Sequence, residues 1–159
     1  MQTKEKIIGI DPGYGRLGVA ILEKKDNVFS VVYSDCIETD KGMGFEDRLF
    51  FICQELKKII VKHKPQYLSM ESLFVNKNQK TISGVYQVRG AVLYIAKELG
   101  LSVIEVSPQQ VKIAITGYGK SEKSAVEKMI RTVLALPKDK KYIDDEIDAL
   151  AVAYSGFFY

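Results

Sequence analysis

Apolar residues form short runs in the first forty positions and follow a helical period afterwards. Residues 7–10, 17–22 and 28–38 are rich in β-branched and aromatic side chains, which predicts three strands. The connections between these runs are short, so the three strands should form an antiparallel meander. Residues 45–63 then carry apolar side chains at helical spacing and end before Pro65, which predicts a helix.

The rest of the chain alternates strands and helices before ending in helices alone. A strand that follows a helical crossover normally lies parallel to its neighbour. We therefore predict an α/β fold with a five-stranded mixed sheet, three antiparallel strands followed by two parallel ones, flanked by helices and forming one domain over residues 1–159. The further elements expected are strands at 67–71 and 102–106, and helices at about 80–99, from Ser107 to Gly117, from Ser121 to about 136 and from Asp144 to about 155.

Two of the predicted strands end in a carboxylate. Asp11 follows the apolar run 7–10 directly and precedes the turn-forming pair Pro12-Gly13, and Glu71 ends the fourth strand. If these strands are parallel neighbours, both acids emerge at the same edge of the sheet, where open α/β sheets usually bind ligands. The simpler alternatives are that Asp11 only caps a turn and that Glu71 only faces water.

The last predicted helix carries two more acids, and their spacing places both on the same face of the helix. Asp145 and Asp148 are three residues apart, and their stripe continues in small and apolar residues, so it should lie near the sheet. Asp144 and Glu146 should project to the flanks, and Glu146→Gln should have little effect. The simpler alternative is that all four acids merely favour a helix N-terminus.

Charge along the chain is uneven, although the formal net charge is only +3. Residues 109–141 carry 8 basic against 3 acidic side chains, whereas residues 142–159 carry four acids and no base. Isolated acids within a basic chain suit a polyanionic substrate that is handled with metal ions. Oxygen ligands without cysteine or histidine favour Mg²⁺ or Mn²⁺ over zinc, and two such ions can support phosphodiester hydrolysis. The simpler alternative is that the lysines only solvate helix faces, as most lysines do.

Several motifs, in order along nearly the whole chain, resemble the RuvC family of bacterial Holliday-junction resolvases, within the ribonuclease H-like superfamily. They are GIDPG at 9–13, ESLF at 71–74, KN at 77–78, QVRG at 87–90, SPQQVK at 107–112, GYGKSEKSAV at 117–126, RTVLALP at 131–137 and D-x-x-DALAVA at 145–153. Two departures stand out. Some members carry a histidine among the final acids, where this chain has carboxylates, and Val88 stands where alanine is frequent.

The resemblance implies a ribonuclease H-like fold and a nuclease that resolves four-way DNA junctions by paired nicks in strands of like polarity. Its catalytic, metal-binding acids would be Asp11, Glu71, Asp145 and Asp148, with two Mg²⁺ per site and Mn²⁺ able to substitute. Its DNA-contacting residues would be Phe74, Lys77, Arg89, Lys120 and Lys123, with Phe74 acting at the opened centre of the junction. Its partners would be junction DNA, a second copy of the chain, and the branch-migration proteins RuvA and RuvB.

The helix at about 80–99 has two apolar stripes, which we interpret as one for its own core and one for the partner copy. The sequence has no apolar run long enough to span a membrane and no signal-peptide pattern, so a cytoplasmic location is expected.

Three alternatives remain. The start DPGYGRLGVAI also resembles the YqgF-type nuclease that acts on RNA, although that type has no counterpart of SEKS and ESLF. A sugar-kinase or Hsp70-type ATPase shares the strand–Asp–turn pattern, but it needs two such domains. A junction-binding module without catalysis would not need all four acids.

Overall fold

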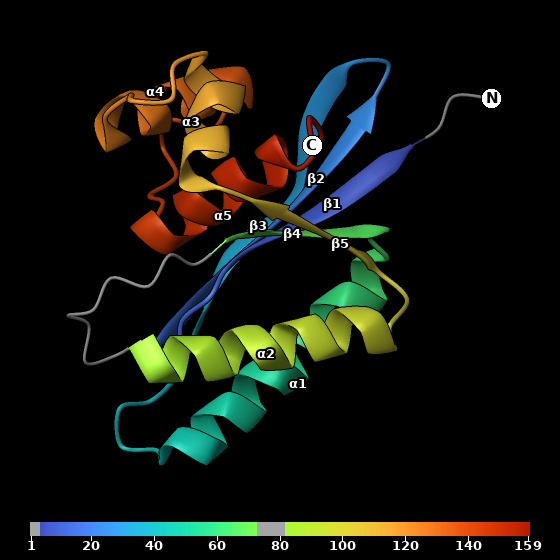
Figure 1. The fold of residues 1–159 in the computed structure, drawn as a ribbon, viewed down its shortest axis with the longest axis vertical. Coiled ribbons are helices and arrows are strands. Elements are labelled where there is room, and N and C mark those ends of the chain that lie inside the picture. Colours follow the sequence, from blue (N-terminus) through green and yellow to red (C-terminus); the bar gives the residue numbers. More distant parts are fainter. Residues whose placement is uncertain (1–3, 73–81) are drawn as a thin grey trace.

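The computed structural model describes residues 4–72 and 82–159. Within these residues five strands form one sheet, and helices lie on both of its faces (Figure 1). In chain order the elements are β1 Glu5–Asp11, β2 Arg16–Lys25, β3 Val28–Glu38, α1 Phe45–His63, β4 Tyr67–Glu71, α2 Ile82–Glu98, β5 Ser102–Val106, α3 Pro108–Thr116, α4 Lys123–Val133 and α5 Asp144–Ser155.

The strand order in the sheet is β3-β2-β1-β4-β5. The pairs β1–β2 and β2–β3 are antiparallel, whereas β1–β4 and β4–β5 are parallel. Both strands that lie parallel to a neighbour are entered from a helix: α1 precedes β4, and α2 precedes β5. A helix between two strands carries the chain back along the sheet, which a parallel pairing requires. The predicted five-stranded mixed sheet is therefore confirmed.

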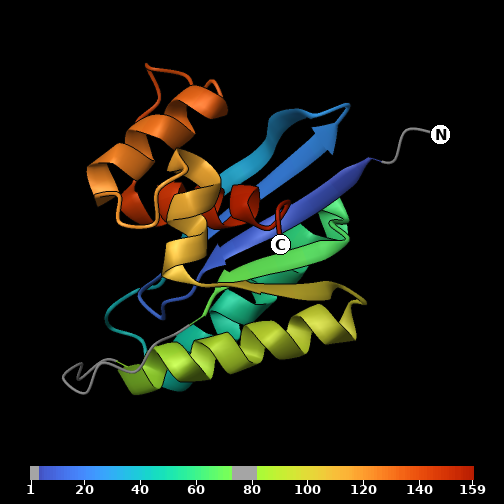
Figure 2. The same cartoon turned by 45° about the horizontal axis from the view of Figure 1, so that its top comes forward.

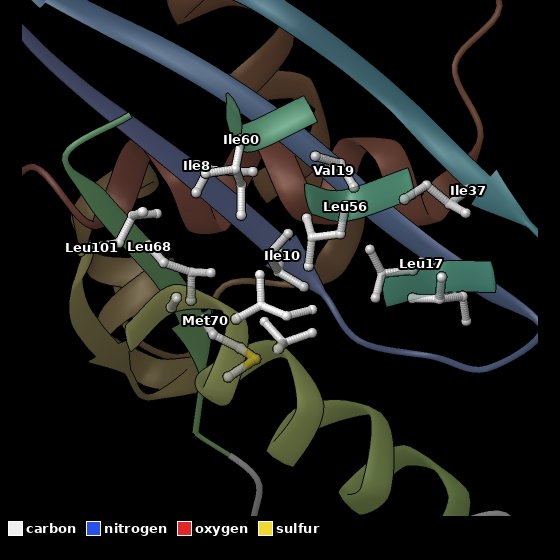
Figure 3. Close-up of a cluster of buried hydrophobic side chains, with 14 of the residues drawn as sticks. Ile8, Ile10, Leu17, Val19, Ile37, Leu56, Ile60, Leu68, Met70 and Leu101 are labelled. Atoms are coloured by element: carbon white, nitrogen blue, oxygen red, sulfur yellow. The ribbon is translucent and has the colours of Figure 1, made fainter. Parts of the chain in front are cut away.

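Each face of the sheet has its own hydrophobic core. Helices α1 and α2 cover one face, and α3, α4 and α5 cover the other (Figures 1 and 2). Because side chains alternate along a strand, Ile8 and Ile10 of β1 enter the core beneath α1 and α2, together with Leu56 and Met70 (Figure 3). Gly9, between the two isoleucines, faces α5.

The backbone of helix α5 comes very close to the sheet where the strands carry glycine. A methyl group added to Gly9 would overlap the carbonyl oxygen of Ala149, and one added to Gly18 would overlap that of Asp145. The Ser69 hydroxyl of β4 donates a hydrogen bond of 2.9 Å to the Val152 carbonyl. The small and apolar stripe of this helix therefore lies against the sheet, as its sequence predicted.

The sequence Ser107-Pro108-Gln109-Gln110 is typical of a capping box, and helix α3 begins with one. Ser107 Oγ accepts from the Gln110 backbone N–H at 3.0 Å, and the Gln110 side chain accepts from the Ser107 N–H at 2.8 Å. These two bonds satisfy backbone donors that a helix N-terminus otherwise leaves free. They fix the direction in which α3 leaves the end of β5.

Helix α4 is shorter than predicted at both ends. Ser121 is not its cap, because its hydroxyl donates to the Tyr118 carbonyl at 2.8 Å within the turn that follows α3. At the other end Ala135 adopts a left-handed backbone conformation with φ of 47°, and the Leu136 N–H bonds back to the Arg131 carbonyl at 2.9 Å. This closure ends α4 before Pro137.

The interpretation of the two apolar stripes on α2 is corrected by its packing. Val92 and Ala96 of one stripe and Val88 and Ile95 of the other are all buried in the chain's own core. Both stripes therefore contribute to the chain's own core, and the large apolar side chains that α2 exposes are Tyr86 and Tyr94. Among the described residues, no helix is long and apolar enough to cross a membrane.

We predict that Gly9→Ala lowers the free energy of unfolding by about 1–3 kcal/mol, because the added methyl forces α5 away from the sheet. Urea denaturation measures this change. Gly90→Ala is the matched control, since Gly90 lies inside α2 with nothing within 4 Å of an added methyl. That control should raise stability by roughly 0.5–1 kcal/mol through helix propensity. An equal response of the two variants would contradict the direct packing.

Candidate active site

Two carboxylates leave the sheet side by side. Asp11 is the last residue of β1 and Glu71 the last of β4. The two strands are parallel and Ile10 pairs with Met70, so the acids occupy the next position in the same register. The expectation that both emerge at one edge of the sheet is met.

A cleft at this edge collects three acids and two lysines. Asp148 reaches it from α5, Lys112 from α3 and Lys123 from the first position of α4. Its volume is about 320 Å³, within the range of small-ligand sites. The remaining lining side chains are apolar or small: Ile10, Pro12, Pro108, Val111, Val126, Ala151 and Val152.

Burial and mutual repulsion raise the pKa values of the carboxyl groups in the cleft. Burial, followed by the charges of Asp148, Asp145 and Glu71, raises the pKa of Asp11 from 3.8 to about 7. Burial and the charge of Asp148 raise the pKa of Glu71, which Lys112 partly offsets. Such clusters of raised carboxyl pKa values are typical of functional sites.

Two of the four predicted acids are held by basic partners. Asp148 accepts from Lys123 Nζ at 3.3 Å, yet burial still raises the pKa of Asp148 above its ordinary value. Asp145 lies 3.6 Å from Arg16 at the start of β2 and is not among the residues that line the cleft. It is still near enough for its charge to raise the pKa of Asp11. The structure thus gathers Asp11, Glu71 and Asp148, with Asp145 beside them.

The donor set fits a hard divalent cation. The side chains at the cleft offer carboxylate oxygens and no sulfur or imidazole, which is the ligand type that Mg²⁺ and Mn²⁺ prefer. In residues 4–72 and 82–159, no three acidic, histidine or cysteine side chains are yet close enough together to hold an ion. The two acids of α5 are instead paired with bases, Asp145 with Arg16 and Asp148 with Lys123.

The family model for crossover junction endodeoxyribonuclease RuvC matches residues 7–155 of this chain. The chain belongs to the RuvC family. It is 44% identical over 149 residues to the crossover junction endodeoxyribonuclease RuvC of Thermosipho melanesiensis, which covers 94% of both chains. RuvC enzymes are metal-dependent nucleases.

Solved structures agree with this assignment. The Thermus thermophilus RuvC structure superimposes with a TM-score of 0.86 at 28% identity, over 97% of this chain and 94% of that one. T. thermophilus RuvC in complex with a Holliday junction substrate gives a TM-score of 0.87 at 27% identity, over 95% and 92% of the two chains. The predicted ribonuclease H-like fold is confirmed, and the YqgF-type and two-domain ATPase alternatives are not favoured.

The residues predicted to contact DNA lie in different environments. Lys123 lines the cleft, and the charges of Asp148, Asp144 and Asp11 outweigh its burial and raise its pKa. Lys120 is exposed in the turn between α3 and α4. Phe74 and Lys77 lie outside the described residues.

Arg89 has an internal role that does not favour the predicted DNA contact. Its side chain is only 11% exposed, donates to the Glu71 backbone carbonyl at 2.9 Å and pairs with Glu105 at 3.0 Å. A partly buried guanidinium with these two partners ties α2 to the ends of β4 and β5. It thereby supports the strand end that carries Glu71.

Lys112 is a residue of the cleft that the sequence reasoning did not single out. It belongs to the SPQQVK motif and lies one helical turn after Pro108, so the same face of α3 carries both residues into the cleft. The capping box at the start of this helix was the available signal, because it fixes which face of α3 turns toward the sheet edge.

The expectation for Glu146 is wrong. Glu146 does not lie on a free flank but is 4% exposed, and it accepts hydrogen bonds from Ser34 at 2.6 Å and Lys140 at 2.7 Å. The helical period places it correctly beside Asp145, but the period cannot show that strand β3 and the segment before α5 close over it. Glu146→Gln should therefore not be silent.

The raised pKa of Asp11 predicts a stability difference that depends on pH. The folded, metal-free protein keeps a proton on Asp11 up to pH about 7, whereas the unfolded chain loses it near 3.8. The stability that this group contributes is complete below pH 3.8 and is lost as the pH rises through about 7. Asp11→Asn should thus be more stable than the wild type at pH 8, by on the order of 2–4 kcal/mol.

Urea denaturation in the presence of a chelator, between pH 4 and pH 8, measures this difference. The two proteins should converge toward pH 4, because a neutral Asp and an Asn place the same charge in the site. A stability difference that stays constant over this pH range would contradict the assigned pKa.

Proposed function

We propose that this chain is a structure-specific endonuclease that resolves four-way DNA junctions by metal-dependent paired nicking of strands of like polarity, in homologous recombination and DNA repair. The observation that carries the proposal is the meeting of Asp11, Glu71 and Asp148 with two lysines in one cleft of a RuvC-family fold. A relative with the same fold, T. thermophilus RuvC, is solved in complex with a Holliday junction substrate.

In this proposal Asp11, Glu71, Asp145 and Asp148 hold two Mg²⁺ ions, for which Mn²⁺ can substitute. The ions would supply a Lewis acid that activates water and stabilises the leaving oxygen of the phosphodiester. The raised pKa of Asp11 supports this role, because a carboxylate that resists ionisation alone gains most from a nearby cation. Ion binding competes with Arg16 for Asp145 and with Lys123 for Asp148.

Lys112 and Lys123 are proposed to bind the scissile phosphate. Both line the cleft that holds the acids, from two different helices, so a phosphate there would meet positive charge from two directions. Once Asp148 engages a cation, the Lys123 ammonium is free to pair with a phosphate oxygen instead. The apolar walls of the cleft lower the local dielectric and strengthen these interactions.

Phe74, Lys77 and Lys120 are proposed as contacts to the junction outside the cleft. Phe74 follows Glu71 by three residues in the sequence. An aromatic side chain there can stack on an unpaired base, which is worth roughly 1–3 kcal/mol. Phe74→Ala should therefore slow nicking of closed junctions more than that of junctions already opened at the centre, and an equal loss on both would refute stacking.

A homodimer is proposed because paired nicking of a four-way junction needs two equivalent sites. The outer faces of α1 and α2 carry exposed aromatic side chains that the chain's own core does not use, among them Phe50 and Tyr94, each 66% exposed. Sedimentation at micromolar concentration checks this, and a monomer that still makes paired nicks would count against it. Association with RuvA and RuvB is proposed from family membership, and failure to co-sediment with them on a junction would oppose it.

A nicking assay on a synthetic four-way junction tests the proposed function. With Mg²⁺ the wild type should make symmetrical nicks, and Asp11→Asn should lower the rate by orders of magnitude while a gel shift shows retained junction binding. Asparagine has the shape of aspartate but not its charge, so the variant should lose the metal ligand needed for cleavage and keep the surface needed for binding. Asp144→Asn, which changes an exposed neighbour in the first turn of α5, is the matched control and should cut like the wild type.

Three outcomes would contradict the proposal in whole or in part. Nicking at wild-type rate by Asp11→Asn would remove that residue from the site. Binding without any metal-dependent nicking by the wild type would favour a silent junction-binding module, and cleavage of structured RNA in place of the junction would favour the YqgF-type alternative.

A further inference from the structure

Glu146 is a buried charge that the proposed cleavage does not use. It is 4% exposed and lies between Asp145 and Asp148 in the sequence, yet its side chain points away from the cleft toward β3. Among residues 4–72 and 82–159, it is the one acidic or basic residue that is almost completely buried. A buried carboxylate is costly unless it is paired, so its partners must fix it in place.

The partners of Glu146 come from two separate segments. Ser34 of β3 donates a hydrogen bond of 2.6 Å to Oε1, and Lys140 Nζ donates one of 2.7 Å to the same oxygen. Lys140 Nζ also lies 3.4 Å from Ser34 Oγ and 4.3 Å from the centre of the Tyr142 ring. We call Ser34, Lys140 and Glu146 the α5 clamp.

The clamp fixes the first turn of α5, which has few other stabilising interactions at its N-terminus. The helix begins after Ile143, which offers no side-chain cap, and its first turn carries three consecutive acids that repel one another. An uncapped first turn frays unless tertiary contacts fix it. The clamp fixes this turn over β3, while Gly18 holds the Asp145 backbone against β2.

We propose that the α5 clamp positions Asp145 and Asp148 for metal binding, so that Lys140 and Glu146 are positioning residues of the site. This inference rests on the proposed metal-dependent function. Neither residue lines the cleft, so both act only through the placement of the first turn of α5. Changes in groups that orient metal ligands typically weaken metal binding about 10–100-fold.

The test measures Mn²⁺ binding to the full chain by isothermal titration calorimetry, at a temperature well below unfolding, without DNA. Lys140→Ala should raise the Mn²⁺ Kd by about tenfold, and Glu146→Gln should do the same. The double variant should be no weaker than either single one, because both changes break one interaction. Lys140→Arg should restore binding to near the wild-type value, since the guanidinium keeps the charge and the donors.

Lys141→Ala is the matched control, because it removes an exposed lysine from the same segment and should leave the Mn²⁺ Kd unchanged. Lys140→Ala leaves the buried Glu146 carboxylate without its cation, so where a single variant does not fold, the double variant, which removes both charges, is measured in its place. The nicking reaction gives a second readout. Lys140→Ala should need more Mg²⁺ for half-maximal rate, while its rate at saturating Mg²⁺ stays near that of the wild type.

Unchanged Mn²⁺ affinity in Lys140→Ala overturns the inference, whatever happens to thermal stability. Weaker junction binding together with unchanged Mn²⁺ affinity also overturns it and assigns Lys140 to DNA. If the wild type itself bound no Mn²⁺, the proposed metal-dependent function would fall as well, which separates that failure from a failure of the clamp alone.

Discussion

The candidate active site depends on one constraint, the direct contact of helix α5 with the sheet. Gly9 and Gly18 leave no side chain between the strands and the backbone of Ala149 and Asp145. An α-helix usually packs on a sheet through a layer of side chains, which would hold its carboxylates farther from the strand ends. Without that layer, Asp148 reaches the cleft that Asp11 and Glu71 also line.

That closeness is unfavourable for the protein alone and is useful for its chemistry. The mutual repulsion of the acids, added to burial, raises the pKa of Asp11 to about 7. Arg16 and Lys123 offset part of the repulsion, because each pairs with one acid of α5. The fold supplies the free energy that keeps these charges together, through two hydrophobic cores and the clamp at Glu146. A divalent cation would relieve the repulsion, and this links metal binding to the stability of the fold.

The order of strands and helices, the five-stranded sheet and the shared edge of Asp11 and Glu71 were predictable from the sequence, because each follows from local periodicity and from the geometry of crossovers. The internal bonds of Arg89 and Glu146 were not, because their partners are far away in the chain or are backbone atoms. Ser34 is 112 residues from Glu146, and Arg89 donates to the Glu71 carbonyl. A helical period shows which side a residue faces but not what covers that side, and for the same reason the two stripes of α2 were misassigned.

Anomalous diffraction from crystals grown with Mn²⁺ tests the central claim most directly, because it locates the ion without relying on catalysis. Anomalous density is expected between Asp11, Glu71 and Asp148, with the Lys123 ammonium displaced from Asp148. Density that is absent there, or that lies at other acids while Asp148 keeps its pair with Lys123, would contradict the claim that the contact of α5 with the sheet builds a metal centre.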